Sequence, residues 1–252
     1  MTIRPHHPLH LPHPPEMPAV WAVVPAAGRG LRMGIDCPKQ YLPLAGAPVL
    51  SWSLRPLLAE PRIGAVVLVV APDELRVAAL PEAGNPKLRV VIGGAERQDS
   101  VRAGLAALAG KAAEHDWVLV HDAARPCLHP HDLGRLLART GDAAFPGGLL
   151  AAPVADTLKR TGGDGRVAQT ICRDGLWRAL TPQMFRWGPL LAAMAAAERD
   201  GARVTDEAQA MERLGHAVEL VPGRSDNLKI THPEDLVLAQ AVLAARSATD
   251  PR

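Results

Sequence analysis

A glycine-rich segment with cationic residues in and after it is the part of this 252-residue chain best suited to chemistry. It runs from Val23 to Gly34 (VVPAAGRGLRMG) and is followed by the sequence PKQYL at 38–42. Backbone N–H groups in such a turn can approach a phosphate chain closely, because glycine has no side chain. Arg32 and Lys39 would place positive charge beside that phosphate chain. The pattern predicts a nucleotide site at which a reaction takes place.

Two well-known phosphate loops would use the same residues, and neither fits. A Walker loop requires Gly-Lys-Ser or Gly-Lys-Thr after four intervening residues, and no such triplet follows Gly28. A dinucleotide-binding turn requires a third glycine where Met33 stands, and the next apolar run ends in Pro72 without the usual acidic residue. The segment instead resembles that of the activated-sugar nucleotidyltransferases, in which it surrounds the triphosphate of an incoming nucleotide. A turn without a chemical role is the plain alternative.

The composition is that of a globular protein with a full core. Apolar residues make up 48% of the chain, and no run of about 18 uncharged apolar residues occurs. The formal net charge of +2 is too small for a general polyanion-binding surface. We therefore expect no nucleic-acid partner and no membrane partner, and we expect phosphate affinity to come from local clusters of cationic side chains.

Residues 1–18 hold six prolines and four histidines with almost no apolar periodicity, so we expect a disordered leader. Its composition does not match a secretion signal or a transit peptide, and its histidines are expected to be incidental, with no metal site built from side chains. The three cysteines, Cys37, Cys127 and Cys172, are odd in number and far apart. This favours a reducing compartment, the cytoplasm.

From residue 19 onward, short apolar runs alternate with helical segments, which predicts an α/β sandwich with a mostly parallel sheet. The predicted strands are 19–24, 65–70, 88–92, 117–120 and 217–221, with a short segment at 227–230. The predicted helices are 49–59, 73–80, 96–109, 188–200, one starting at Thr205, and 233–246. Residues 19–246 would form one domain, and 247–252 a C-terminal tail.

Three loops should meet at one edge of this sheet. They are 28–34, 93–94 and 121–126, and each follows a predicted strand directly. Because the carboxyl ends of parallel strands lie at the same edge, ligands bind there. The three loops together therefore predict one site.

The alternation breaks at about 153–180. Two short segments, 156–160 and 166–171, flank the sequence TGGDG, which predicts a β-hairpin. A lone hairpin cannot bury both faces, so we expect a protruding arm whose partner is a second copy of the chain.

Six motifs occur in order between residues 19 and 246: PAAGxGxRM, PKQYL, HDAARP, LTPQ, TDEA and NLKI. Together they resemble the 2-C-methyl-D-erythritol 4-phosphate cytidylyltransferase family. The resemblance implies a Rossmann-like nucleotidyltransferase fold, CTP and methylerythritol phosphate as substrates, and a place in the non-mevalonate route to isoprenoids. It also implies Mg²⁺ bound mainly through the CTP phosphates, and a homodimer formed through the β-arm.

By this resemblance four cations are catalytic. Arg32 and Lys39 would stabilise charge on the α-phosphate and the leaving pyrophosphate, while Arg173 and Lys229 would hold the attacking phosphate. Arg173 would come from the neighbouring subunit, as would Thr157, so each site would be composite. No general base is required, because the attacking phosphate is already ionised. The plain alternative for each cation is an exposed side chain or a weak surface ion pair.

The resemblance also assigns binding residues. The nucleotide would contact Pro25, Ala26, Ala27, Gly28, Gly30, Gly94, Ser100, Asp122 and Ala123. The acceptor would contact Asp122, Arg125, Thr157, Arg173, Thr181, Thr205 and Lys229. Thr205 is equally suited to a helix N-cap. Ala95 replaces an acid that some relatives carry, which would weaken selection for cytosine.

The same residues bear on three other functions. Ribitol 5-phosphate cytidylyltransferase shares the fold and chemistry, and only the acceptor pocket would separate the two. A non-catalytic nucleotide sensor is disfavoured by Arg32, Lys39 and Lys229. A serine-histidine pair of Ser100 and His121 is rejected, because no Gly-x-Ser-x-Gly turn surrounds the serine.

Overall fold

The computed structural model describes residues 18–28 and 37–249. The predicted leader, apart from Pro18, lies outside the described residues, and so do Gly30 and Arg32 of the glycine-rich segment. No helix in the described ranges is both long and apolar enough to cross a membrane.

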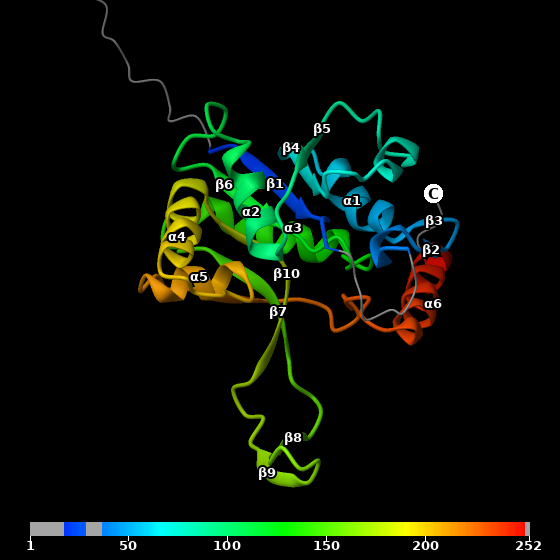
Figure 1. The fold of residues 1–252 in the computed structure, drawn as a ribbon, viewed down its shortest axis with the longest axis vertical. Coiled ribbons are helices and arrows are strands. Elements are labelled where there is room, and N and C mark those ends of the chain that lie inside the picture. The colour runs from blue at the N-terminus through cyan, green and yellow to red at the C-terminus, as the bar shows by residue number, and fades with distance from the viewer. Residues whose placement is uncertain (1–17, 29–36, 250–252) are drawn as a thin grey trace, which may run out of the picture.

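A seven-stranded sheet in the order β11-β7-β10-β6-β1-β4-β5 forms the centre of the molecule (Figure 1). Its strands are β1 (Val20–Pro25), β4 (Ile63–Val70), β5 (Leu88–Ile92), β6 (Trp117–Val120), β7 (Gly148–Pro153), β10 (Trp177–Arg186) and β11 (Glu219–Pro222). β10 pairs antiparallel with both of its neighbours, whereas every other pairing in this sheet is parallel. The predicted α/β class and mostly parallel sheet are confirmed.

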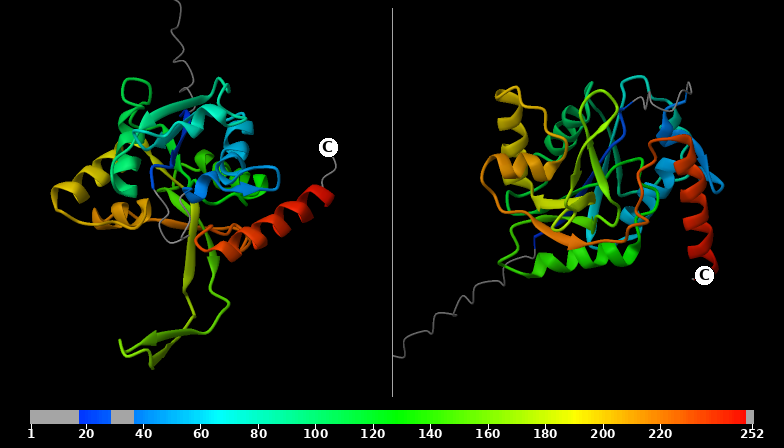
Figure 2. Two further views of the ribbon diagram at one scale, coloured as in Figure 1. Left: turned by 45° about the vertical axis from the view of Figure 1, so that its right-hand side comes forward. Right: turned by 90° about the horizontal axis from the view of Figure 1, so that it is seen from below.

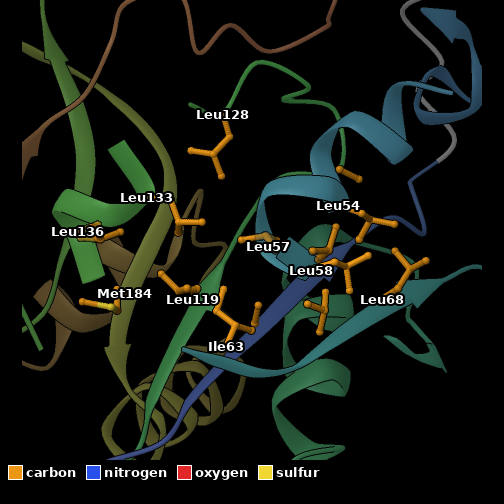
Figure 3. Packing of buried hydrophobic residues seen from close by; sticks show 14 of the residues in the cluster. Leu54, Leu57, Leu58, Ile63, Leu68, Leu119, Leu128, Leu133, Leu136 and Met184 are labelled. Atoms are coloured by element: carbon orange, nitrogen blue, oxygen red, sulfur yellow. The ribbon is translucent and has the colours of Figure 1, made fainter. Parts of the chain in front are cut away.

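Successive side chains along the strands enter two different cores. Ala22 and Val24 of β1 pack in one hydrophobic cluster, while Val23 between them packs in the other. The first cluster lies against α1 (Val49–Ala59) and α3 (Pro130–Ala138), and part of it is drawn in Figure 3. The second lies against α2 (Arg97–Ala106), α4 (Trp187–Arg199) and α5 (Glu207–Arg213). Because helices cover both faces of the sheet, its central strands are continuous apolar runs in the sequence.

Gly104 lets α2 lie directly on β1. A Cβ atom at this position would come within 2.4 Å of Cγ1 of Val23, a separation that real side chains do not tolerate. The close approach brings the first turns of α2, with Arg97 and Ser100, to the carboxyl end of β1. This packing therefore positions part of the site.

A third apolar cluster fixes the C-terminal part of the chain. α6 (Pro233–Thr249) buries Ala239 and Leu243 against Leu44 of the small hairpin formed by β2 (Pro43–Leu44) and β3 (Ala47–Pro48). Ile230 belongs to the same cluster and is wholly buried. The segment that carries Lys229 is thereby held beside the sheet.

The predicted hairpin is present as a separate two-stranded sheet of β8 (Leu158–Thr161) and β9 (Val167–Ile171). It continues from the ends of β7 and β10 and stands away from the body of the molecule (Figures 1 and 2). Residues 155–170 are exposed throughout, apart from the half-buried Leu158. An arm is therefore observed, and its use in dimerisation stays a prediction.

Several predicted elements differ from those observed. The helix predicted at 73–80 is wrong: only a 3-10 turn, Arg76–Ala79, forms there, and it ends at Leu80, where the following Pro81 disfavours a helical conformation. The helix predicted from Thr205 begins instead after its N-cap Asp206, whose side chain accepts a hydrogen bond from the Gln209 N–H. Residues 227–230 form no strand, and α6 continues to Thr249, into the predicted tail.

Candidate active site

A cavity of about 230 Å³ lies at the carboxyl ends of β1 and β6, where the predicted loops were expected to meet. The predicted site residues that line it are Pro25, Ala26, Ala27, Gly28, Lys39, Ser100, Asp122, Ala123 and Lys229. Sequence reasoning missed three further lining residues, Gln40, Arg97 and Ala124. Gln40 and Ala124 lie within the motifs PKQYL and HDAARP, so position in a motif was the available signal for them, whereas Arg97 lies in none of the six motifs and falls only within the predicted helix 96–109.

Asp122 is the electrostatic centre of this cavity. Its carboxylate oxygens lie 2.8 Å from Nζ of Lys229, 3.0 Å from Nε of Arg97 and 3.5 Å from Nε of Arg125. Burial alone would raise the pKa of Asp122, but the charges of these three cations outweigh burial and hold that pKa far below its usual range. The carboxylate therefore stays ionised and orients the cations around it.

A second buried carboxylate holds Arg97 from the other side. Glu207, at the start of α5, has a wholly buried side chain and accepts hydrogen bonds from both terminal nitrogens of Arg97, at 2.8 and 3.2 Å. Burial by itself would lower the pKa of Arg97, but the charges of Glu207 and Asp122 raise it above its usual value. Arg97 thus stays charged, and its side chain connects Glu207 on α5 with Asp122 in the cavity.

Lys39 connects two walls of the cavity. It begins the 3-10 turn η2 (Lys39–Tyr41), and its ammonium group donates a hydrogen bond to the carbonyl of Ile230 at 2.7 Å. The N–H of Ile230 in turn donates to the carbonyl of Ala124 at 2.8 Å. Lys39 and Lys229 are therefore brought together although 190 positions separate them in the sequence.

Arg125 and Thr181 hold residues 227–230, the segment that carries Lys229. Arg125 donates to the carbonyl of Asn227 at 2.7 Å, and the side-chain amide of Asn227 donates to the carbonyl of Thr181 at 2.8 Å. These bonds explain how residues 227–230 are fixed without forming a regular element. Neither Arg125 nor Thr181 is among the residues that line the cavity, so acceptor contact by either stays a prediction.

A buried polar chain runs behind Asp122. The N–H of Asp122 donates to the Thr181 hydroxyl at 3.1 Å, and that hydroxyl donates to Nδ1 of His121 at 2.9 Å. The direction follows from the carbonyl of Arg125, which can only accept: Nε2 of His121 lies 3.2 Å from it and carries the ring proton, so Nδ1 is left to accept from the Thr181 hydroxyl. Burial lowers the pKa of His121 to about 4, so the ring is neutral. With both ring nitrogens in use, His121 does not activate Ser100.

Ser100 and Gly94 lie on α2 and at its entry. The Ser100 hydroxyl faces the cavity region but donates to the carbonyl of Glu96 at 3.2 Å, one turn back in the helix. A Cβ on Gly94 would come within 2.4 Å of the Asp99 Cβ, so only glycine fits the turn before α2. Gly94 itself lines a separate hollow between β5 and α4, not this cavity.

Three residues predicted to contact the acceptor substrate lie outside the cavity of their own chain. Arg173 and Thr157 are on the arm and exposed, and Arg173 donates to the carbonyl of Ala155. Thr205 is also exposed, and both its N–H and its hydroxyl donate to the Gln209 side chain, at 2.7 and 3.2 Å. A single copy of the chain therefore does not bring Arg173 to Lys39 and Lys229.

Comparisons with known proteins show the family of this chain. The sequence profile of the 2-C-methyl-D-erythritol 4-phosphate cytidylyltransferase family matches residues 20–245. A protein of that name from Escherichia coli O1:K1 is 52% identical over 225 residues, which cover 89% of this chain and 93% of the relative.

Solved structures of two proteins with the same name share the fold. The Francisella tularensis structure has a TM-score of 0.76 at 32% identity, covering 89% of this chain and 99% of the other. The Thermus thermophilus structure has a TM-score of 0.74 at 33% identity, covering 90% and 99%. The resemblance drawn from the six motifs is confirmed, and this chain belongs to the 2-C-methyl-D-erythritol 4-phosphate cytidylyltransferase family.

Proposed function

We propose that this protein transfers the CMP group of CTP to 2-C-methyl-D-erythritol 4-phosphate. The products would be 4-diphosphocytidyl-2-C-methyl-D-erythritol and pyrophosphate, in the non-mevalonate route to isoprenoids. One observation carries the proposal beyond family membership. Lys39, Lys229 and Arg97 line one cavity at the sheet edge, where Asp122 and Glu207 fix Arg97 and Lys229 in place.

The chemistry requires cations more than it requires a base. An oxygen of the acceptor phosphate forms a bond to the α-phosphorus of CTP, and the bond from that phosphorus to the bridging oxygen of the β-phosphate breaks. Pyrophosphate leaves with the electron pair. Two polyanions must meet for this step, so fixed positive charge lowers the barrier by preorganised electrostatic stabilisation. Lys39 would act on the triphosphate, together with Arg32, and Lys229 on the acceptor phosphate.

Magnesium would reach this site with the nucleotide. Bound to the triphosphate, Mg²⁺ would neutralise part of its charge. Asp122 is the only carboxylate among the described lining residues, and the described part of the chain contains no group of three or more histidine, cysteine or acidic residues able to hold a metal. The described donor set therefore fits an ion held mainly by the CTP phosphates.

We further propose a homodimer in which the arm supplies Arg173 and Thr157 to the cavity of the neighbouring copy. The exposed arm, and the separation of both residues from the cavity of their own chain, support this. Trp177 is 38% and Leu176 37% exposed at the base of the arm, which gives a second copy an apolar surface to cover. The three free cysteines support a reducing compartment, the cytoplasm.

Release of pyrophosphate from purified protein tests the reaction. CTP, UTP, ATP and GTP are each combined with methylerythritol phosphate or ribitol 5-phosphate in the presence of Mg²⁺. We expect release with CTP and methylerythritol phosphate, with little from the other pairs. Efficient turnover of ribitol 5-phosphate would favour the alternative acceptor. Comparable rates with UTP would show that Ala95 has relaxed base selection, and no release with any pair would overturn the proposal.

A further inference from the structure

The 3-10 turn η2 points three consecutive side chains at three different parts of the molecule. A 3-10 helix has three residues per turn, so neighbouring side chains diverge by about 120°. Lys39 reaches the carbonyl of Ile230, Gln40 reaches the loop after β1, and Tyr41 is buried in the hydrophobic core. Core packing of Tyr41 therefore fixes the directions of Lys39 and Gln40.

Gln40 holds the loop after β1 by two hydrogen bonds. Gln40 is 4% exposed, and its Nε2 donates to the carbonyl of Ala26 at 2.7 Å and to that of Gly28 at 3.0 Å. Both partners are acceptors, so the nitrogen of the carboxamide, and not its oxygen, must face them. The two N–H bonds of one amide group thus connect two peptide units of the cavity wall.

Among the described residues, no other side chain donates a hydrogen bond to either of these two carbonyls. Gly28 is exposed, and no described atom lies within 4 Å of the position a Cβ would occupy there. Ala26 is fixed on its other side, where its N–H donates to the carbonyl of Val69 at 2.7 Å. In a trans peptide the C=O and N–H point in opposite directions, so a fixed Ala26 carbonyl also fixes the direction of the Ala27 N–H. Ala27 lines the cavity.

We propose that Gln40 is a positioning residue for the nucleotide, because its carboxamide sets which side of the Ala26 and Gly28 peptide units faces the cavity. The inference rests on the proposed function, since it takes CTP as the nucleotide. Loss of the two N–H donors leaves two carbonyls without their partner and lets the wall change conformation. The effect should appear mainly in CTP affinity, because Lys39 and Lys229 keep their own contacts.

Two substitutions at this position test the proposal. Gln40→Met keeps the approximate size and removes both donors, and Gln40→Glu removes them at neutral pH. We expect the Kd for CTP and the KM for CTP to rise by about tenfold or more in both, with kcat at saturating CTP changed by less than about threefold. Gln240→Glu, on the exposed surface of α6, makes the same chemical change away from the site and should match the wild type.

The pH dependence of Gln40→Glu tests whether the side chain at position 40 acts as a hydrogen-bond donor or only fills space. Two carbonyls and burial favour the protonated form of the introduced carboxyl group, which raises its pKa. Once protonated, that group can again donate one hydrogen bond. The ratio of its KM to the wild-type KM should therefore fall as the pH is lowered from 8 to 6, while the ratio for Gln40→Met stays constant.

The outcomes distinguish this inference from the proposed function. Wild-type CTP affinity in Gln40→Met would overturn the inference alone, as would a pH-independent ratio in Gln40→Glu. If Gln40→Glu does not fold, the affinity of Gln40→Met still decides. A wild-type protein that binds no CTP would overturn the proposed function and the inference with it.

Discussion

The cavity and the arm use charged residues in opposite ways. At the cavity, the side chains of Asp122, which lines it, and Glu207, on the other side of Arg97, are 9% and 0% exposed, and together they hold Arg97. On the arm, the ion pair between Arg166 and Asp164 spans 3.8 Å, and its side chains are 88% and 57% exposed. Charges of the first kind are fixed before any ligand arrives, whereas charges of the second kind are screened by water.

This difference indicates what each region can contribute to catalysis. A fixed cation surrounded by protein needs no reorganisation when charge develops on a phosphate. An exposed arm cation such as Arg173 gains that property only when another surface buries it. The cavity would thus be built by one chain and completed by another, and the following predictions test this division of roles.

The largest expected effect is the loss of a cation from the cavity. Lys39→Ala should lower kcat by about 10²-fold or more, because Lys39 would act on charge that develops in the transition state. Pyrophosphate release under saturating substrates measures it, and circular dichroism checks the fold. The control is Lys111→Ala, at an exposed site. Turnover near the wild-type value in Lys39→Ala would contradict the role given to this residue.

The second prediction concerns the arm. Arg173→Ala alone should be inactive, like Lys39→Ala, but mixing the two variants should restore activity if the arm completes the neighbouring site. A heterodimer then has one intact site of two, so after full subunit exchange about one quarter of the wild-type activity should return.

Analytical ultracentrifugation establishes whether the chain forms a dimer at the assay concentration. The mixture is compared with each variant alone at the same total concentration. If dimers exchange subunits and no activity returns, Arg173 does not act across the interface.

A smaller effect should separate buried from exposed ion pairs. Glu207→Gln removes the charge that faces Arg97 inside the protein and should lower the free energy of unfolding by about 2 kcal/mol, because a buried cation loses its counter-charge. Asp164→Asn on the arm should change it by less than about 0.5 kcal/mol. Urea denaturation measures both, and equal changes would mean that the two regions do not differ in this respect.

The last prediction is a dependence of stability on pH that originates beside Asp122. The pKa of His121 is about 4 in the folded protein and about 6.5 in an unfolded chain. Between pH 4 and pH 6.5, His121 binds a proton in the unfolded state but not in the folded state. The free energy of unfolding should therefore decrease as the pH falls from 6.5 to 4, by up to about 1.4 kcal/mol per pH unit from this residue.

The variant His121→Asn removes this contribution, so its stability should decline less steeply with falling pH than that of the wild type. The arm from 153 to 180 contains no histidine and cannot produce the effect. His216→Asn, at an exposed position, serves as the control and should keep the wild-type slope. Parallel pH profiles for wild type and His121→Asn would contradict the assignment.

The sheet and its loops were predictable because the signals are local. Strands 88–92 and 117–120 and helix 49–59 agree with the structure to the residue. β6 is buried on both faces and is apolar along its length, whereas β5 lies at the edge of the sheet and leaves Val90 and Ile92 exposed. The helix predicted at 73–80 forms only a 3-10 turn, and Pro81 explains its end, because a proline disfavours a helical conformation at the residue before it. β7 was not predicted, and the start of β10 was included in the predicted arm, because the chain passes from β7 through the arm to β10 without an intervening helix.

The amino-acid sequence by itself determined the α/β class, the glycine-rich segment, the cations near it and the hairpin, because each depends on residue types and short spacings. Tertiary structure alone decided which charges meet. Arg97 reaches both Asp122 and Glu207, and Gln40 faces Ala26 and Gly28, through contacts between distant segments or around a turn. The physical reason is that hydrogen bonds and ion pairs act over a few ångströms in space, a distance on which sequence separation sets no limit.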